Sequence, residues 1–213
     1  MPAAVVFDFN GTLSDDEPIM CRVVAGLLAE HGQPISEREY YDELAGHMDE
    51  EIVRRKLGAD YPRAEEFLAE RIARYQAAVS DGSTIGADVR DAVRYAAARV
   101  PVAIVSGATR AEIEPVVEAA GLAPFLQGIV SADDVAQGKP DPEAYLRALA
   151  LLDGGLPAED VLAFEDTDVG VASAKAAGLR VVGVTRTLGA ARLAQADELI
   201  PELRLAEVQR LLG

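Results

Sequence analysis

The sequence predicts an α/β fold in which a helical domain interrupts a doubly wound parallel sheet. Along most of the 213 residues, short apolar runs rich in β-branched side chains alternate with longer helical patterns. Runs that are apolar on both faces are typical of parallel strands covered by helices on either side. Between about residues 15 and 80 this alternation stops and only helical signals remain. We therefore expect a Rossmann-like core with an inserted all-helical cap domain.

Six apolar runs are the predicted strands of the core. They are residues 4–7 (AVVF), 102–105 (VAIV), 128–130 (GIV), 161–164 (VLAF), 181–184 (VVGV) and the weaker 198–200 (ELI). The helical patterns that follow or separate them lie near residues 88–98, 110–120, 142–151, 168–177 and 204–212. Strands that alternate with helices in this way predict a parallel sheet with helices on both faces.

The stretch between the first and second strands carries signals for four successive helices. Pro18 suits a first helical turn, HGQP at 31–34 is a stop signal, SERE at 36–39 is typical of a capping box, and GADYP at 58–62 breaks the pattern. Residues 13–17 and 80–86 are the predicted hinges. We expect a core domain of residues 1–14 and 82–213 and a cap domain of residues 15–81.

Charge and cysteine content narrow the class of protein. Asp and Glu number 36 against 20 for Lys and Arg, a formal net charge of −16, which opposes binding to nucleic acid or to an anionic membrane. The single cysteine, Cys21, cannot form an internal disulfide, and we find neither a secretion leader nor an apolar run of membrane-spanning length. We expect a cytoplasmic monomer or homodimer that binds neither nucleic acid nor membrane.

Polar side chains interrupt the apolar pattern where the predicted strands end. The residues at these positions are Asp8 after the first strand, Ser106-Gly107 after the second strand, Lys139 just before the helix that follows the third strand, and Glu165-Asp166 after the fourth strand. The carboxyl ends of parallel strands meet at one edge of a sheet, where ligands bind. These residues should therefore converge.

The chemistry of this cluster suits a cation and an anion together. Three carboxylates without a His or Cys cluster suit a hard cation such as Mg²⁺, whereas an ammonium, a hydroxyl and backbone N–H groups suit an anion with several oxygens. Thr109 and Glu112 form a candidate capping box, so Ser106-Gly107 precedes a helix N-terminus, where phosphate is favoured. A metal, a phosphate and a carboxylate nucleophile together indicate phosphoryl transfer.

The motifs, taken in order, resemble the haloacid dehalogenase (HAD) superfamily, in the branch of phosphatases and β-phosphoglucomutase-like enzymes with a helical cap. The family's Asp-x-Asp-x-Thr after a strand is similar to DFNGT at 8–12, its strand-ending Ser or Thr matches Ser106, and its lysine before proline matches Lys139-Pro140. Its acidic pair matches Glu165-Asp166, within a resemblance that covers nearly the whole chain. Any one motif is weak evidence, but four in order at strand ends are strong evidence.

This resemblance implies roles for the matching residues. The implied catalytic residues are Asp8 as nucleophile, Asn10 and Lys139. The implied ligands of Mg²⁺ are Asp8, the backbone carbonyl of Asn10, Glu165 and Asp166. The implied substrate-binding residues are Thr12, which also fixes the loop, Ser106, Gly107, Lys139 and His47, the last because related caps carry a loop at that point that dips into the active site.

Asn10 departs from the family pattern, because most family phosphatases have there an aspartic acid that exchanges protons with the leaving oxygen and the attacking water. An amide cannot do this, and such catalysis is typically worth about 10²–10⁴ in rate. Three interpretations follow. The leaving group needs little protonation; or Asp15, Asp16, Glu17 or His47 supplies another acid; or the protein is a weakly active or non-catalytic phospholigand binder.

These residues together predict a Mg²⁺-dependent phosphoric monoester hydrolase. It would remove phosphate from a small phosphorylated metabolite through an aspartyl-phosphate, with the cap closing over the substrate. A phosphosugar mutase is the alternative within the same branch, but a mutase needs the acid/base at position 10 in both half-reactions. A phosphonate-cleaving enzyme would need a cap lysine for a Schiff base, and Lys56 at a predicted helix end is better interpreted as a solvated charge.

Overall fold

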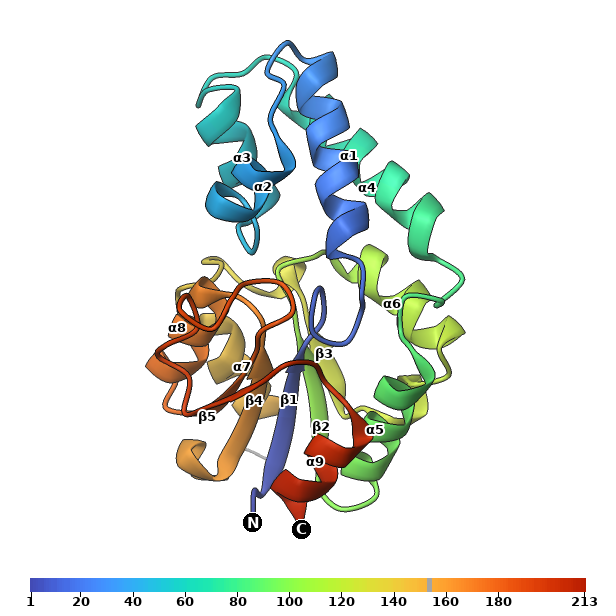
Figure 1. The fold of residues 1–213 in the computed structure, drawn as a ribbon, viewed down its shortest axis with the longest axis vertical. Coiled ribbons are helices and arrows are strands. Elements are labelled where there is room, and N and C mark those ends of the chain that lie inside the picture. Colours follow the sequence, from blue (N-terminus) through green and yellow to red (C-terminus); the bar gives the residue numbers. More distant parts are fainter. Residues whose placement is uncertain (153–154) are drawn as a thin grey trace.

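The centre of the molecule is a six-stranded parallel sheet (Figure 1). The computed structural model describes residues 1–152 and 155–213. Its strands are β1 (Ala4–Asp8), β2 (Val102–Val105), β3 (Gly128–Val130), β4 (Val161–Glu165), β5 (Arg180–Val184) and β6 (Glu198–Ile200). Every predicted strand is present within one residue of its expected bounds. The α/β class predicted from the sequence is confirmed.

The strand order of the sheet is β3-β2-β1-β4-β5-β6, with all neighbours parallel. Strands β2 and β3 are added successively on one side of β1. The chain then crosses back, and β4, β5 and β6 are added successively on the other side of β1. The order therefore reverses between β1 and β4. In open sheets of this kind the crevice at the reversal is where ligands bind.

Two hydrophobic clusters cover the two faces of the sheet. Along β1 the side chains alternate, so that Val5 and Phe7 belong to one cluster and Ala4 and Val6 to the other. Helices α5 (Ala87–Ala97), α6 (Arg110–Ala119) and α9 (Leu205–Leu212) pack on the first face, and α7 (Glu143–Leu151) and α8 (Asp168–Ala176) on the second. This double cover explains why the strands are apolar along their whole length.

A helical unit stands above the carboxyl edge of the sheet, built from the stretch that follows β1 (Figure 1). Its elements are α1 (Glu17–Glu30), α2 (Glu37–Glu43), α3 (Asp49–Lys56) and α4 (Ala64–Val79). They share a hydrophobic cluster of their own. The four predicted helices of the insertion are confirmed, and we call this unit the cap.

The predicted helix signals in the cap act locally as expected. Ser36 is the N-cap of α2, and its hydroxyl accepts a hydrogen bond from the backbone N–H of Glu39 at 3.1 Å. His31 is the C-cap of α1, and Gly32 follows in a left-handed conformation with φ of 80°. These stops fold the insertion back on itself instead of letting it run as one long helix.

The cap and the sheet domain are joined by more than the two chain crossings. Tyr75 and Val79, at the end of α4, belong to the hydrophobic cluster of the sheet domain. Ser14 and Thr84, one from each crossing, are joined by a hydrogen bond of 2.7 Å between their hydroxyls. The division into residues 1–14 with 82–213 and residues 15–81 stays a prediction.

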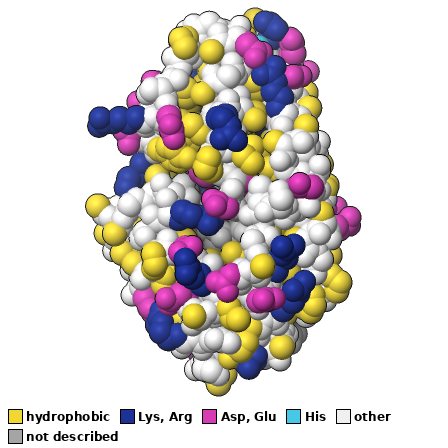
Figure 2. Space-filling view, turned by 45° about the vertical axis from the view of Figure 1, so that its right-hand side comes forward, with side chains coloured by type: hydrophobic (Ala, Val, Ile, Leu, Met, Phe, Trp, Pro, Cys, Tyr) yellow, Lys and Arg dark blue, Asp and Glu magenta, His cyan; other side chains and the backbone are white. Residues whose placement is uncertain are grey.

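Acidic and basic side chains are interspersed over the face shown in Figure 2, and neither sign gathers into a continuous region there. A phosphate-backbone binder would present a basic stripe. Of the helices described, none combines the length and the apolar character that crossing a membrane requires.

Candidate active site

Three of the predicted residues meet at the carboxyl edge of the sheet, where the strand order reverses. Asp8 ends β1, and Glu165 ends its neighbour β4. Lys139 reaches across from the loop before α7, and its Nζ donates to Asp8 Oδ1 and to Glu165 Oε1, both at 2.5 Å. All three side chains are buried, so the ion pairs are shielded from water and salt.

Three carboxylates at this edge form a group that could hold a metal ion. Asp8, Glu165 and Asp166 each offer one oxygen, and these oxygens all lie within 4.8 Å of one another. Asp166 Oδ2 is buried and has no hydrogen-bond partner within residues 1–152 and 155–213. Buried carboxylates this close repel one another unless a cation or protons lie between them. The donor set and the orphaned oxygen therefore fit a divalent cation that prefers oxygen ligands.

The electrostatics of the carboxylates support the same conclusion. Burial raises the pKa of Asp8 to about 8, with a further upward contribution from Glu165, although Lys139 opposes both. Burial also raises the pKa of Asp166 well above its usual range, with contributions from Asp8 and Glu165. A bound divalent cation would favour the ionised forms and lower both pKa values.

The loop after β1 is packed tightly against this carboxylate group. Gly11 has φ of 74°, and a Cβ placed on it would lie 1.9 Å from Asp166 Oδ2, so only glycine fits. Thr12 is fully buried, and its hydroxyl donates to Asp166 Oδ1 at 3.3 Å. This hydrogen bond from Thr12 fixes the loop after β1 relative to the carboxylate of Asp166.

The segment after β2 leads into the N-terminus of α6 as predicted. The capping box between Thr109 and Glu112 is present. Ser106 is buried; its hydroxyl accepts from the backbone N–H of Ala108 at 3.0 Å and donates to Asn10 Oδ1 at 3.2 Å. Gly107 and Ala108, by contrast, line the cavity above the edge.

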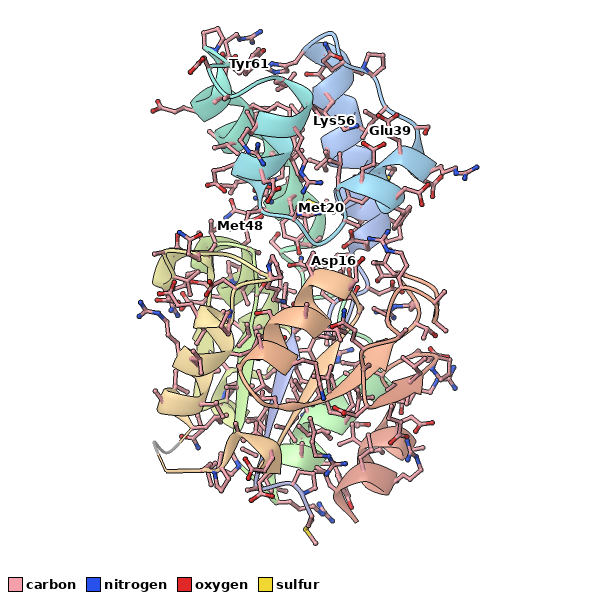
Figure 3. All side chains as sticks on the ribbon, turned by 90° about the vertical axis from the view of Figure 1, so that its left-hand side faces the viewer. Asp16, Met20, Glu39, Met48, Lys56 and Tyr61 are labelled. Atoms are coloured by element: carbon pink, nitrogen blue, oxygen red, sulfur yellow. The ribbon has the colours of Figure 1, made fainter. Side chains whose placement is uncertain are left out.

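Asn10 is held by a network of buried hydrogen bonds. Its Nδ2 donates to Asp16 Oδ2 at 3.1 Å and to the hydroxyl of Tyr75 at 3.0 Å, and Tyr75 in turn donates to Asp16 at 2.5 Å. Asp16 is fully buried, which raises its pKa to about 6. Figure 3 places Asp16 at the junction between cap and sheet. The amide of Asn10 is therefore fixed in orientation as well as unable to exchange protons.

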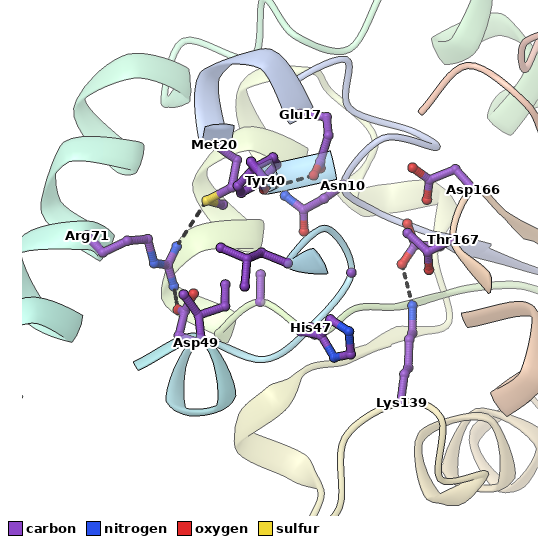
Figure 4. Close-up of a pocket in the computed structure, with 16 residues that line it drawn as sticks. Asn10, Glu17, Met20, Tyr40, His47, Asp49, Arg71, Lys139, Asp166 and Thr167 are labelled. Atoms are coloured by element: carbon purple, nitrogen blue, oxygen red, sulfur yellow. Dashed lines mark hydrogen bonds and ion pairs between the residues drawn. The ribbon is translucent and has the colours of Figure 1, made fainter. Parts of the chain in front are cut away.

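A cavity of about 70 Å³ lies between the sheet edge and the cap (Figure 4). From the sheet side it is lined by Asp8, Asn10, Gly107, Ala108, Lys139, Asp166 and Thr167. From the cap it is lined by Glu17, Met20, Tyr40, Leu44, Gly46, His47, Asp49, Ile52 and Arg71. The cavity thus has one wall from the sheet edge and one from the cap.

The loop between α2 and α3 brings the cap close to the sheet domain. Gly46 has φ of 82°, and a Cβ on it would come within 2.8 Å of Thr167 Cγ2, so the chain can approach only with glycine there. His47 lines the cavity, as predicted, and burial lowers its pKa. Its Nδ1 is buried and lies 3.6 Å from Glu51 Oε2, too far for a hydrogen bond.

The cap side holds polar residues that sequence reasoning did not assign. Tyr40 donates its hydroxyl to Glu17 Oε1 at 2.9 Å. Arg71, on α4, is buried and ion-paired with Asp49 of α3 and with Glu112 of α6, so one side chain ties two cap helices to the sheet domain. The sequence marks Glu17 only as one of four candidate acids, and no motif marks Tyr40, Asp49 or Arg71.

Lys56 lies away from this cavity. Its Nζ forms ion pairs with Glu39 at 2.6 Å and Glu43 at 2.8 Å, and Figure 3 shows Lys56 beside Glu39, well above Asp16. It is an ion-paired residue of the cap and not a lining residue of the cavity.

Comparisons with known proteins agree with the architecture. The model of the haloacid dehalogenase-like hydrolase family matches residues 2–178. The validoxylamine A 7'-phosphate phosphatase of Streptomyces hygroscopicus subsp. limoneus is 30% identical over 206 residues, 95% of each chain. The phosphoglycolate phosphatase of Pseudomonas putida (strain KT2440) is 28% identical over 219 residues, 100% of this chain and 79% of that one.

A solved structure with the same fold contains a phosphorylated ligand. It is the CbbY protein of Rhodobacter sphaeroides in complex with xylulose-(1,5)bisphosphate, in a mutant that carries asparagine in place of an aspartate. It is 26% identical, covers 95% of both chains and superposes with a TM-score of 0.81.

Proposed function

We propose that the protein hydrolyses phosphate monoesters through an aspartyl-phosphate formed on Asp8. The chain belongs to the haloacid dehalogenase-like hydrolase family, and within it to the phosphatases that act on small phosphorylated metabolites. The carrying observation is the placement of Asp8 at the strand-order reversal, hydrogen-bonded to Lys139 and facing the cavity. The carboxylate would attack phosphorus, a P–O bond to Asp8 would form, and the bond to the leaving oxygen would break.

Mg²⁺ is the proposed cofactor. Asp8, Glu165, Asp166 and the backbone carbonyl of Asn10 would hold it, and when bound it would offset negative charge on the carboxylates and the phosphoryl oxygens. Lys139 would orient Asp8 and neutralise charge on the phosphoryl group. The backbone N–H of Gly107 would complete the oxyanion contacts, while Ser106, which accepts from the Ala108 N–H, and Thr12 would hold the loops that present them.

Protonation of the leaving oxygen must proceed differently in this chain than in most family phosphatases, because Asn10 stands where they have an aspartic acid. Asp15 is exposed and lies 3.6 Å from Arg186, and Asp16 does not line the cavity. Glu17 and His47 are the two remaining candidates that face the cavity. We propose that turnover is fastest for leaving groups that need little protonation, such as acyl and aryl phosphates.

A phospholigand-binding role with little turnover is the second candidate. The fixed amide of Asn10 favours it, and so does the CbbY complex, in which an asparagine mutant holds a bisphosphate. A phosphosugar mutase is disfavoured because both of its half-reactions need a proton exchanger where Asn10 stands. A cytoplasmic location and a monomeric or homodimeric state stay predictions.

The test is Mg²⁺-dependent phosphate release from acetyl phosphate, an aryl phosphate and alkyl phosphates, with Asp8→Asn as the blank. The matched control is Asp160→Asn, an exposed aspartate just before the amino end of β4, at the opposite edge of the sheet. We expect turnover that Asp8→Asn abolishes and Asp160→Asn preserves, with a steep dependence on leaving-group pKa. Tight Mg²⁺-dependent binding with no turnover of any member would instead establish the binding role.

A further inference from the structure

The two permanently charged basic residues that line the cavity, Lys139 and Arg71, are both ion-paired with carboxylates of the protein. Lys139 is shared by Asp8 and Glu165 at the sheet edge, where the phosphoryl group would sit. On the cap side the one permanent cation among the lining residues is Arg71. His47 also faces the cavity, but burial lowers its pKa and leaves it mainly uncharged near neutral pH.

Arg71 is already neutralised by two carboxylates. Its side chain is 2% exposed, and its Nη1 and Nη2 donate to Glu112 and Asp49, with Nη2 also 3.2 Å from Glu112 Oε2. The three side chains together carry a net charge of −1. A ligand that drew Arg71 away would leave the carboxylate of Glu112, 1% exposed, buried without a counter-ion, although Thr109 still donates to it, and this is strongly unfavourable.

One donor of Arg71 remains unused. Its Nε is buried and has no hydrogen-bond partner in the described residues. A buried N–H without an acceptor is costly, and because this atom is enclosed by protein it adds no cationic contact for a ligand. Arg71 thus offers no free charge to an anion.

Glu17 adds an acceptor on the same side. It is 8% exposed, and Tyr40 donates to its Oε1, while its Oε2 has no hydrogen bond among the described residues (Figure 4). A largely buried carboxylate gains from an O–H or N–H⁺ donor and is opposed by a second negative charge. Burial and the neighbouring Asp16 raise the pKa of Glu17 to about 7, which shows how poorly this site tolerates negative charge.

We propose that the cap side of the cavity selects phosphate monoesters whose leaving group carries hydroxyl or ammonium groups and no second anionic group, with Glu17 as the residue that makes this distinction. The proposal rests on the phosphatase function given above and specifies its substrate class. It separates the chain from relatives named for a substrate with a carboxylate, such as phosphoglycolate.

Three two-carbon phosphates that differ in one terminal group test the proposal: 2-aminoethyl phosphate, 2-hydroxyethyl phosphate and phosphoglycolate. Each is measured with Mg²⁺ both as a substrate and as a competitive inhibitor of aryl phosphate turnover. We expect the amine and the alcohol to be preferred over phosphoglycolate by about tenfold or more, in kcat/KM or in inhibition constant. Glu17→Gln should narrow that ratio, because the carboxylate that opposes the anion is gone.

The matched control is Glu37→Gln, which removes one negative charge from an exposed position in the first turn of α2 and should leave the ratio unchanged. Phosphoglycolate bound or turned over as well as the other two would overturn the proposal, and so would a ratio that Glu17→Gln and Glu37→Gln affect alike. If the aryl phosphate itself is not hydrolysed, the phosphatase function fails instead, and calorimetric affinities of the three ligands still decide the selectivity.

Discussion

The two walls of the cavity differ in how their charges are organised. On the sheet side, three carboxylates lie close together at the ends of adjacent parallel strands; Lys139 pairs with Asp8 and Glu165, and Asp166 Oδ2 has no partner among the described residues. On the cap side, Arg71 is paired on both ends and Glu17 bonds to Tyr40. The sheet wall leaves room for the proposed cation, whereas the charged groups of the cap wall are already paired or hydrogen-bonded.

This difference separates chemistry from selection. Strand ends are rigid, so they can hold reacting groups in a fixed geometry. The cap wall is carried on the helices inserted after β1, and under the proposed cap closure its groups would suit recognition of the substrate in the closed state. Asn10 lies where the two meet, with its amide bonded to Asp16 and Tyr75, residues of the predicted hinge and of α4.

The largest effect is expected from giving the sheet wall a proton exchanger. Asn10→Asp should raise kcat for alkyl phosphates by about 10²–10⁴. The new carboxyl would lie near Asp16, which is now 3.1 Å from Asn10 Nδ2, so the pair would retain one proton near neutral pH. Phosphate release from alkyl and acetyl phosphates measures the gain, which should be small for acetyl phosphate.

The matched control for that prediction is Gln33→Glu, the same change from amide to acid at an exposed cap position. It should leave both rates unchanged. If Asn10→Asp likewise fails to change the alkyl rate, another group, such as Glu17 or His47, already supplies the proton, and the sheet wall is not deficient in the way we describe.

The sheet wall could be predicted from the sequence because its geometry follows from the topology. Asp8, Ser106 and Glu165 each end or follow an apolar run, and parallel strands bring such positions to one edge. The cap wall could not be predicted in this way. Arg71 and Glu112 are 41 positions apart on helices of different domains, and their contact depends on the angle at which the cap closes, which no local pattern records.

His47 and Glu17 show the limits of that contrast. The resemblance to related caps, which carry a loop that dips into the active site at this point, predicts that His47 contacts the substrate, and the close approach of Gly46 to Thr167 shows how this loop comes near the sheet edge. Glu17 begins α1 beside two other acids, and composition alone gives no reason to choose among Asp15, Asp16 and Glu17. Their separate positions depend on the turn of the chain between β1 and α1.

A smaller effect is expected where the two walls are joined. Arg71→Met should lower the free energy of unfolding by about 3–5 kcal/mol, because it leaves the buried carboxylate of Glu112 without its counter-ion. Arg74→Met is the matched control on the same helix, since Arg74 pairs with Glu30 and Glu70 at the surface and should cost about 1 kcal/mol or less. Urea denaturation of both variants measures the difference.

A second substitution makes that test specific to the buried charge. Adding Glu112→Gln to Arg71→Met should recover part of the lost stability, because it removes the uncompensated carboxylate. Equal and small losses for Arg71→Met and Arg74→Met would show that cap and sheet domain are not held together by this ion pair, and that the charged groups of the cap wall are less firmly paired than we describe.

The smallest effect concerns Glu17, whose carboxylate faces a cavity that opposes negative charge. Its pKa is raised from 4.5 to about 7, first by burial and then by Asp16. Between these two pH values the folded protein keeps a proton that the unfolded chain has released, so this group's contribution to stability is greatest below about pH 4.5 and is lost as the pH rises to about 7.

Glu17→Gln removes this pH dependence. Without Mg²⁺, the free energy of unfolding of the variant relative to the unmodified protein should therefore rise by about 2–3 kcal/mol between pH 4 and pH 8. Asp16, with a pKa of about 6, titrates in both proteins and largely cancels from the comparison, and Glu37→Gln should show no such gain. Parallel unfolding curves at the two pH values for all three proteins would reveal it; a difference between Glu17→Gln and the unmodified protein that stays constant with pH would mean that Glu17 is solvated, and that the cap wall does not resist negative charge.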